Sequence, residues 1–231
     1  MHPAIERLRG GLIVSCQAEG DDPFNKPEYI ALFARAAEMG GAAGVRARDA
    51  TNIRAIKAAV GLPVIGLTKG AYPDGSVLIT PDLDDAAALV EAAADVLAVD
   101  ATCRVRPSGL TGAQFVAAVK ERRAVPVMAD CATLDEALAA EAAGADMVGT
   151  TLSGYTPYSR PPAEDGPDWN LLSAMVARVA VPVIAEGHVS TPADAARAIA
   201  LGAFAVVVGT VITRPRVMVG RYADAVRSAT T

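Results

Sequence analysis

Two short sequence phrases alternate along the chain, and this alternation constrains the fold more than any other feature. One phrase starts an apolar run with a proline, in Leu62–Leu67, Val125–Ala129 and Val181–Ala185. The other places Gly or Ala before an apolar run, in residues 41–45, 93–99, 144–148 and 202–208. Proline is tolerated at the first residue of a strand, and a Gly or Ala stop before an apolar run is typical of a helix end followed by a buried strand.

Together with Leu12-Ile13-Val14, these runs predict eight buried strands. Alanine-rich amphipathic segments lie between them, in residues 27–39, 50–60, 82–93, 111–123, 133–143, 168–179, 192–201 and 215–228. Eight βα units with continuously apolar strands predict one (β/α)8 barrel domain over residues 1–231, with its ligand site at the C-terminal ends of the strands. The alternative is an open doubly wound sheet, but that fold usually has fewer strands, and its G-x-G-x-x-G turn is absent here.

Composition excludes several classes of protein. Hydrophobic residues make up 52% and charged residues 20% of the chain, which does not fit a disordered protein. The net charge is −5 and no basic block occurs, so we expect no nucleic-acid partner. No run of 18 apolar residues occurs, so we expect no membrane span. The N-terminal residues, including His2, do not resemble a secretory signal and are expected to fray.

Cysteine and histidine usage points away from disulfides and metals. Cys16, Cys103 and Cys131 are far apart in sequence and odd in number, so we interpret them as reduced thiols of a cytoplasmic protein. The chain has two histidines and no CxxC pair, so it lacks the usual ligand pattern of a zinc site. We therefore expect no metal.

Ionisable residues follow five of the eight predicted strands: Arg46, Lys69, Asp100, Asp130 and Glu186. Sites of barrel enzymes form at these strand ends. An unpaired charge so close to the barrel mouth costs several kcal/mol or changes its pKa. Polar residues also follow strands simply because loops are polar, but five converging ionisable groups predict a charged, functional pocket.

Glycines and helix starts follow the last two strands, in residues 186–192 and 209–215. Glycine lets backbone N–H groups approach a phosphate, and barrels often bind phosphate at these two positions. An arginine adds a charge-assisted contact. We therefore predict a phosphate site formed by Gly187, His188, Gly209, Thr210 and Arg214. In the alternative interpretation, Gly209 only makes a tight turn and His188 is solvated.

Lys69 is the main candidate for proton transfer. Burial, or a cation such as Arg46, lowers the pKa of a lysine, which then serves as a general base or forms a Schiff base. A nearby carboxylate such as Glu186 raises the pKa of a lysine instead. The sequence does not show which of these effects on the pKa of Lys69 is larger. The alternative is a structural ion pair of Lys69 with Glu186 or Asp100.

One long segment, residues 153–168, is rich in Pro, Gly and Ser. A loop of this length in a compact domain is usually functional. Tyr155 lies on it, and Tyr72 follows the third strand. Each tyrosine either contacts a ligand or covers the barrel rim.

Several short strings between residue 10 and about residue 215 resemble one known family. The most specific are Ser15-Cys16-Gln17-Ala18 and residues 150–156, Thr-Thr-Leu-Ser-Gly-Tyr-Thr. On these strings the chain resembles the N-acetylmannosamine-6-phosphate 2-epimerases of bacterial sialic acid catabolism. Further matches are Gly10–Val14, Gly44–Ala47, Ile53–Lys57, Leu62–Leu67, Lys69, Tyr72, Val77–Pro81, Asp100–Thr102, Arg106-Pro107, Met128–Cys131, Val183–Gly187, Val207–Gly209 and Ile212–Pro215.

The resemblance implies an isomerase without a cofactor that interconverts N-acetylmannosamine 6-phosphate and N-acetylglucosamine 6-phosphate, and it makes a homodimer the expected assembly. It implies that Lys69 is the catalytic acid/base and Glu186 its partner. The remaining implied contacts are Gln17, Arg46 and Asp130 to the sugar, and the Gly187 and Gly209 loops with Arg214 to the phosphate. The chain departs from the family pattern at Gly70-Ala71 and in the acidic segment Glu19–Asp22.

The residues by themselves leave other functions open. A class I aldolase would use Lys69 as a Schiff base, which borohydride would trap in the presence of substrate. A phosphosugar-binding barrel without catalysis would need fewer ionisable groups at its mouth. Another phosphosugar isomerase on the same barrel is not distinguished by the fold, because one fold serves many functions.

Overall fold

The barrel of this protein is closed by eight parallel strands. The computed structural model describes residues 1–122, 124–159 and 166–229. The strands follow one another around the barrel in the order β1-β10-β9-β8-β7-β6-β3-β2. Their bounds are β1 (Leu12–Cys16), β2 (Gly44–Arg48), β3 (Val64–Leu67), β6 (Val96–Asp100), β7 (Val127–Asp130), β8 (Met147–Gly149), β9 (Val183–Ala185) and β10 (Ala205–Val208). The predicted (β/α)8 barrel is confirmed, and the open doubly wound sheet is wrong.

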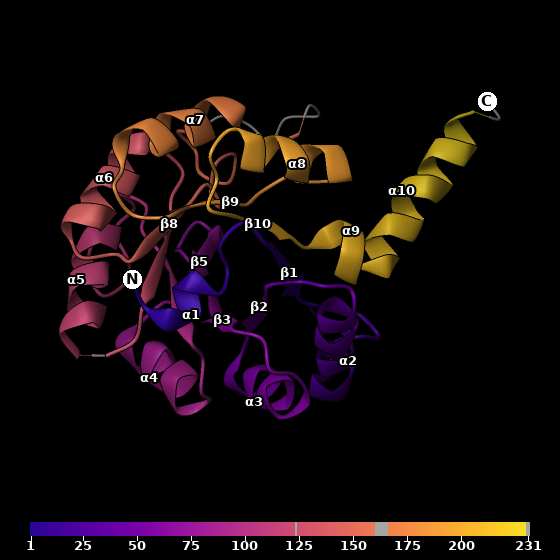
Figure 1. Cartoon of the computed structure of the whole chain (residues 1–231), viewed down its shortest axis with the longest axis horizontal. Coiled ribbons are helices and arrows are strands. Elements are labelled where there is room, and N and C mark those ends of the chain that lie inside the picture. Colours follow the sequence, from indigo (N-terminus) through magenta and orange to yellow (C-terminus); the bar gives the residue numbers. More distant parts are fainter. Residues whose placement is uncertain (123, 160–165, 230–231) are drawn as a thin grey trace.

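Helices connect the strands and lie on the outside of the barrel (Figure 1). The connecting helices are α2 (Pro27–Met39), α3 (Ala50–Ala59), α4 (Leu83–Glu91), α5 (Gly112–Arg122), α6 (Leu134–Ala142), α7 (Trp169–Arg178) and α8 (Pro192–Ala200). Two further helices, α9 (Thr210–Thr213) and α10 (Pro215–Ser228), follow the last strand. Thr133 and Glu136 form a reciprocal capping box at the start of α6. The last helix, α10, has no buried residue and runs away from the barrel (Figure 1).

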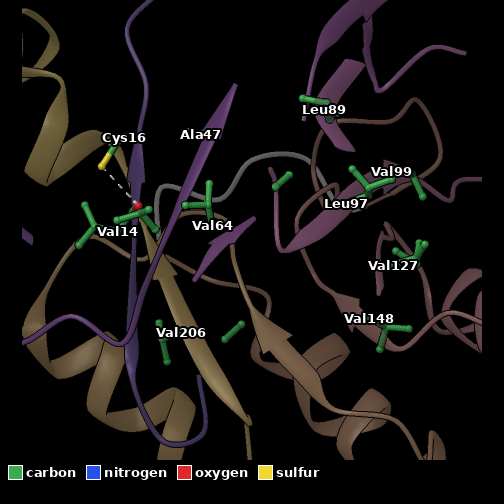
Figure 2. Close-up of a cluster of buried hydrophobic side chains, with 14 of the residues drawn as sticks. Val14, Cys16, Ala47, Val64, Leu89, Leu97, Val99, Val127, Val148 and Val206 are labelled. Carbon is green, nitrogen blue, oxygen red and sulfur yellow. Dashed lines mark hydrogen bonds between the residues drawn. The ribbon is translucent and has the colours of Figure 1, made fainter. Parts of the chain in front are cut away.

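Side chains alternate along each strand between two apolar cores, because successive residues of a strand point to opposite faces. Outward-facing residues pack beneath the helices (Figure 2), among them Val14, Val64, Leu97, Val148 and Val206. Inward-facing residues fill the barrel, among them Ile13, Ile65, Val96, Met147 and Val207. Cys16 belongs to the outer core, where its Sγ lies 3.6 Å from the carbonyl oxygen of Val14.

The N-terminal residues form a short helix, α1 (Pro3–Glu6), that packs against the inner core. Ile5 is 1% and Leu8 0% exposed. His2 caps the helix by accepting the backbone N–H of Ala4 through Nδ1. The expectation that this terminus frays is therefore wrong, because two apolar side chains cover the barrel end opposite the site.

A two-stranded hairpin that the sequence analysis did not predict follows β3. It pairs β4 (Lys69–Ala71) with β5 (Val77–Ile79) in antiparallel register. Its turn is stabilised by Asp74, whose carboxylate accepts the backbone N–H of Ser76, and by Gly75 at φ +82°. Pro-Asp-Gly is a turn signature with this mechanism. Lys69 is thus part of a hydrogen-bonded strand at the barrel mouth rather than of an irregular loop.

Candidate active site

A cavity of about 580 Å³ opens at the C-terminal ends of the barrel strands. Nearly all of the predicted site residues line it: Gln17, Arg46, Lys69, Tyr155, Glu186, Gly187, His188, Gly209, Thr210 and Arg214. Residues from both ends of the chain meet there, because β1 pairs with β10. The predicted charged pocket is present, although Asp100 and Asp130 are not in its lining.

The two-residue period of the strands explains why these side chains meet. Ile13, Ile65 and Ile184 all face the interior of the barrel. Residues an even number of positions further along point the same way while the strand continues. Gln17, Lys69 and Glu186 lie just beyond the ends of β1, β3 and β9, at an even spacing from these isoleucines, and all three line the cavity.

Arg46 on β2 connects two carboxylates at the base of the cavity. Its Nη2 lies 2.6 Å from Asp130 Oδ2, and its Nη1 lies 3.1 Å from Asp130 Oδ1 and 2.9 Å from Glu186 Oε2. Arg46 is 1% exposed. Burial by itself lowers the pKa of Arg46, but the two carboxylates outweigh this effect and hold the pKa above its ordinary value. The guanidinium is therefore a fixed positive charge.

Asp130 lies beneath Arg46 and is completely buried. Both of its oxygens accept hydrogen bonds from Arg46, and Oδ1 also accepts the Thr151 hydroxyl at 2.6 Å. The resemblance implied that Asp130 holds the sugar. Asp130 is the last residue of β7, it is not among the residues that line the cavity, and its side chain contacts Arg46 and Thr151. Its contact with the sugar stays a prediction.

Glu186 has the electrostatic environment of a proton-transfer group. Burial raises its pKa to about 7, and the neighbouring Asp130 carboxylate adds to this increase. Arg46 and a hydrogen bond from Thr151, whose Oγ1 lies 3.3 Å from Glu186 Oε2, act in the opposite direction. A carboxyl group with a pKa near neutrality both accepts and releases a proton under physiological conditions.

Lys69 forms an ion pair with Glu19, a residue of the loop after β1. Neither predicted partner of Lys69 is the observed one. Asp100 is completely buried and pairs with Arg104 at 2.9 Å, and Glu186 pairs with Arg46. The reason is local: the hairpin places Lys69 at the cavity rim, whereas Asp100 is still within β6.

The other end of the cavity is built from the two glycine segments and from cations. Gly187 has φ +102°, and a Cβ on Gly209 would approach the Cβ of Ser15 to 3.2 Å. Arg214 lies here, and Arg221 reaches the same cavity from α10. Two guanidiniums beside the glycine backbones make this part of the cavity suited to an anion, although the Glu19 carboxylate lies 3.9 Å from Arg214.

Two aromatic rings stand at the cavity rim. Tyr155 and His188 stack with ring centroids 5.3 Å apart and an interplanar angle of 10°. Of the long segment 153–168, residues 160–165 lie outside the described part of the structure. Tyr155 and His188 both line the cavity, and the contact of Tyr155 with the ligand stays a prediction.

Sequence analysis missed three residues of this site. Thr151 lies two positions beyond Gly149 of β8, so the alternation rule could have found it. Glu19 was noted only as part of an acidic segment. Arg221 lies in the middle of α10 and carries no local signal at all.

The described residues hold neither a candidate membrane span nor a candidate metal site. No helix in this part of the chain is both long and apolar enough to cross a membrane. Residues 1–122, 124–159 and 166–229 contain no group of three or more His, Cys, Asp or Glu side chains arranged to hold a metal ion.

Comparison with known proteins places the chain among sugar-phosphate epimerases. The family NanE, described as "Putative N-acetylmannosamine-6-phosphate epimerase", matches residues 30–228. A protein from Caldanaerobacter subterraneus subsp. tengcongensis, named as a 2-epimerase of the same substrate, is 46% identical over 94% of this chain and 92% of its own. A relative from Thermosynechococcus vestitus, named likewise, is 46% identical over 97% of this chain and 96% of its own.

A solved structure agrees with these sequence matches. The N-acetylmannosamine-6-phosphate 2-epimerase from Clostridium perfringens superimposes with a TM-score of 0.89 and 40% sequence identity. The match covers 97% of this chain and 96% of the other.

Proposed function

The chain belongs to the N-acetylmannosamine-6-phosphate epimerase family, and we propose that it interconverts N-acetylmannosamine 6-phosphate and N-acetylglucosamine 6-phosphate. The protein is accordingly an isomerase of the carbohydrate epimerase type. One observation of its own supports the proposal most strongly. A lysine and a carboxyl group with a pKa of about 7 line the same cavity as a cluster of cations suited to phosphate.

The reaction requires proton transfer at C2 of the sugar. The C2 hydrogen becomes acidic when the ring opens and C1 is a free aldehyde. A base then removes this proton, which leaves an enolate, and return of a proton to the opposite face inverts C2. We assign the transfer at C2 to Lys69, with Glu186 as the group that exchanges a proton with it or with the substrate.

Arg46 supports this chemistry electrostatically. Its guanidinium lies between Asp130 and Glu186 and fixes the Glu186 carboxyl group in one orientation. A fixed, buried positive charge also stabilises the negative oxygen that develops during enolisation. Asp130, buried beneath Arg46, acts by positioning that guanidinium.

The phosphate is assigned to the end of the cavity formed by Gly187, His188, Gly209, Thr210 and Arg214. Anchoring this remote end fixes C2 relative to Lys69 and reduces the entropy lost during the reaction. Gln17, whose Nε2 donates to Ser15 Oγ at 2.7 Å, is assigned to the sugar together with Tyr155. No cofactor enters these steps.

Proton NMR in D₂O with a chelator present tests the proposal. Purified protein and N-acetylmannosamine 6-phosphate should yield N-acetylglucosamine 6-phosphate that carries deuterium at C2. Lys69→Ala serves as the control and should give neither product nor exchange. If folded wild-type protein gives no conversion and no exchange at C2, the proposal is refuted. Trapping of Lys69 by borohydride would instead indicate an aldolase.

We also propose that two copies of the chain associate through α10. Val219 and Tyr222 on this helix are 67% and 71% exposed. On the barrel, Leu32 of α2 and Ile199 of α8 are also exposed, on the two helices that flank the seam between β1 and β10 (Figure 1). Exposed apolar patches of this kind mark protein interfaces. A second copy that covers the apolar face of α10, formed by Pro215, Met218, Val219, Tyr222, Ala223 and Val226, accounts for it.

Sedimentation measures this association directly. The wild-type protein should sediment with twice the mass of one chain, and Tyr222→Glu should sediment as a monomer because a carboxylate cannot be buried there without a partner. A wild-type protein that sediments as a monomer at micromolar concentration would refute the homodimer.

A cytoplasmic location is proposed from the cysteines. All three are free thiols in the described structure, and Cys16 and Cys131 are buried. Burial raises the pKa of both thiols, which keeps them protonated and unreactive. Free thiols are the usual state of cysteine in the reducing cytoplasm.

A further inference from the structure

Glu19 places a negative charge inside the cavity, between Lys69 and Arg214. We assigned Lys69 to C2 of the sugar and Arg214 to the phosphate. One carboxylate oxygen accepts a hydrogen bond from Lys69 Nζ, and the other lies 3.9 Å from Arg214 Nη2. The three side chains are 27 to 33% exposed. Burial raises the pKa of Glu19, but Lys69 and Arg214 outweigh this and hold it below its ordinary value. The carboxylate is therefore ionised at neutral pH.

The position of this carboxylate conflicts with a bound substrate. Arg214 is assigned to the substrate phosphate and Lys69 to C2 of the sugar. An anion that binds Arg214 comes close to the Glu19 carboxylate, and like charges this near repel each other. While Lys69 remains paired with Glu19, its amine is also held away from a role at C2. Binding must therefore separate Glu19 from at least one of the two cations.

The loop that carries Glu19 is held in place by contacts outside the cavity. The carbonyl oxygen of Glu19 accepts the backbone N–H of Asp22 at 3.1 Å. Asp21 is 87% exposed at its side chain and forms a surface ion pair with Arg216 of α10 at 2.5 Å. The loop thus carries one acidic side chain that enters the cavity and another that stays on the surface.

We propose that Glu19 is an internal competitor of the substrate phosphate and that it holds Lys69 in an ion pair until the substrate binds. In the unliganded site its carboxylate neutralises Lys69 and weakly engages Arg214. An incoming phosphate replaces it at Arg214 and repels it, and the separation releases Lys69 for proton transfer. Part of the free energy of phosphate binding is in this way used to separate Lys69 from Glu19, which makes the amine available at C2. The proposal rests on the assigned epimerase site.

Inorganic phosphate binding provides a test that does not depend on turnover. Calorimetry at constant pH and ionic strength should show that Glu19→Gln binds phosphate roughly fivefold more tightly than the wild type, which is the upper effect expected for a partly exposed charge contact. Asp21→Asn removes the same charge from the same loop outside the cavity, and it should bind phosphate as the wild type does. Affinity in Glu19→Gln that is unchanged or weaker would overturn the proposal.

Steady-state kinetics separates competition for Arg214 from the other roles that Glu19 could have. Glu19→Gln should lower KM for N-acetylmannosamine 6-phosphate, because nothing then competes for Arg214. A raised KM would show that Glu19 binds the sugar, and loss of kcat at constant KM would show that it takes part in the chemistry; either result would refute the proposal. If the wild type has no epimerase activity, the phosphate measurement still decides whether Glu19 competes for the anion.

Discussion

Replacing Glu186 by Gln should make the stability of the protein less dependent on pH. The amide has nearly the same shape and still accepts a hydrogen bond from Arg46, but it does not titrate. In the wild type, burial raises the pKa of Glu186 from 4.5 to about 7. The folded protein therefore binds this proton more tightly than the unfolded chain does. The resulting stabilisation is complete below pH 4.5 and is lost as the pH rises through about 7.

The size of the effect follows from that interval. At 1.36 kcal/mol per pH unit, the interval from 4.5 to about 7 corresponds to about 3 kcal/mol of unfolding free energy. Roughly 2.5 kcal/mol of this falls between pH 5 and pH 8.5 by the same relation. All other ionisable groups are present in both proteins, so the difference between their free energies of unfolding isolates Glu186. Between pH 5 and pH 8.5, the free energy of unfolding of the wild type should therefore fall by this amount relative to that of Glu186→Gln.

Urea titrations monitored by circular dichroism measure the difference at each pH. The reasoning would be refuted if the difference between the two free energies of unfolding stayed constant from pH 5 to pH 8.5. It would also be refuted if the wild type became more stable relative to Glu186→Gln as the pH increased. Either result would mean that Glu186 does not have a raised pKa in the folded protein. The carboxyl group would then be fully ionised at neutral pH and unsuited to return a proton to the substrate.

Three further replacements test the site and its supports. Lys69→Ala should reduce kcat at least about 100-fold, as loss of a general base does, while the urea midpoint stays close to that of the wild type; near-normal turnover would contradict the assignment. Arg46→Met should lower the free energy of unfolding at pH 8 by about 3–5 kcal/mol because the buried Asp130 loses its partner, and a change below about 1 kcal/mol would contradict this. Leu8→Ala should cost about 2–5 kcal/mol by leaving a cavity, yet leave KM unchanged because Leu8 lies at the opposite end of the barrel.

The parts of the structure that depend on local periodicity could be predicted. Apolar runs that follow proline, glycine or alanine mark all eight barrel strands, and the residue that ends each run is close to the barrel mouth. Arg46, Lys69 and Glu186 were identified in this way, and all three line the cavity. Parallel strands in a closed barrel bring their C-terminal ends together whatever the details of the loops, so this inference needed no knowledge of long-range contacts.

The features that depend on side-chain partners could not be predicted. The alternation rule indicates that Asp100 and Asp130 point inward, but not that they are fully buried outside the cavity lining and paired with Arg104 and Arg46. The partner of Lys69 depends on where the hairpin aims its ammonium group relative to Glu19, which is 50 residues away in sequence. Such choices are decided by packing and charge in the folded state.

The closure of the barrel also has a consequence for the order of folding. β1 is complete once the first 16 residues have been made, but its partner β10 ends only at Val208. Joining strands from opposite ends of a chain is entropically expensive and therefore slow. Gln17 and Glu19 follow β1, whereas Gly209 and Arg214 follow β10. During synthesis on the ribosome, the anion-binding end of the cavity can thus form only after nearly the whole chain has emerged.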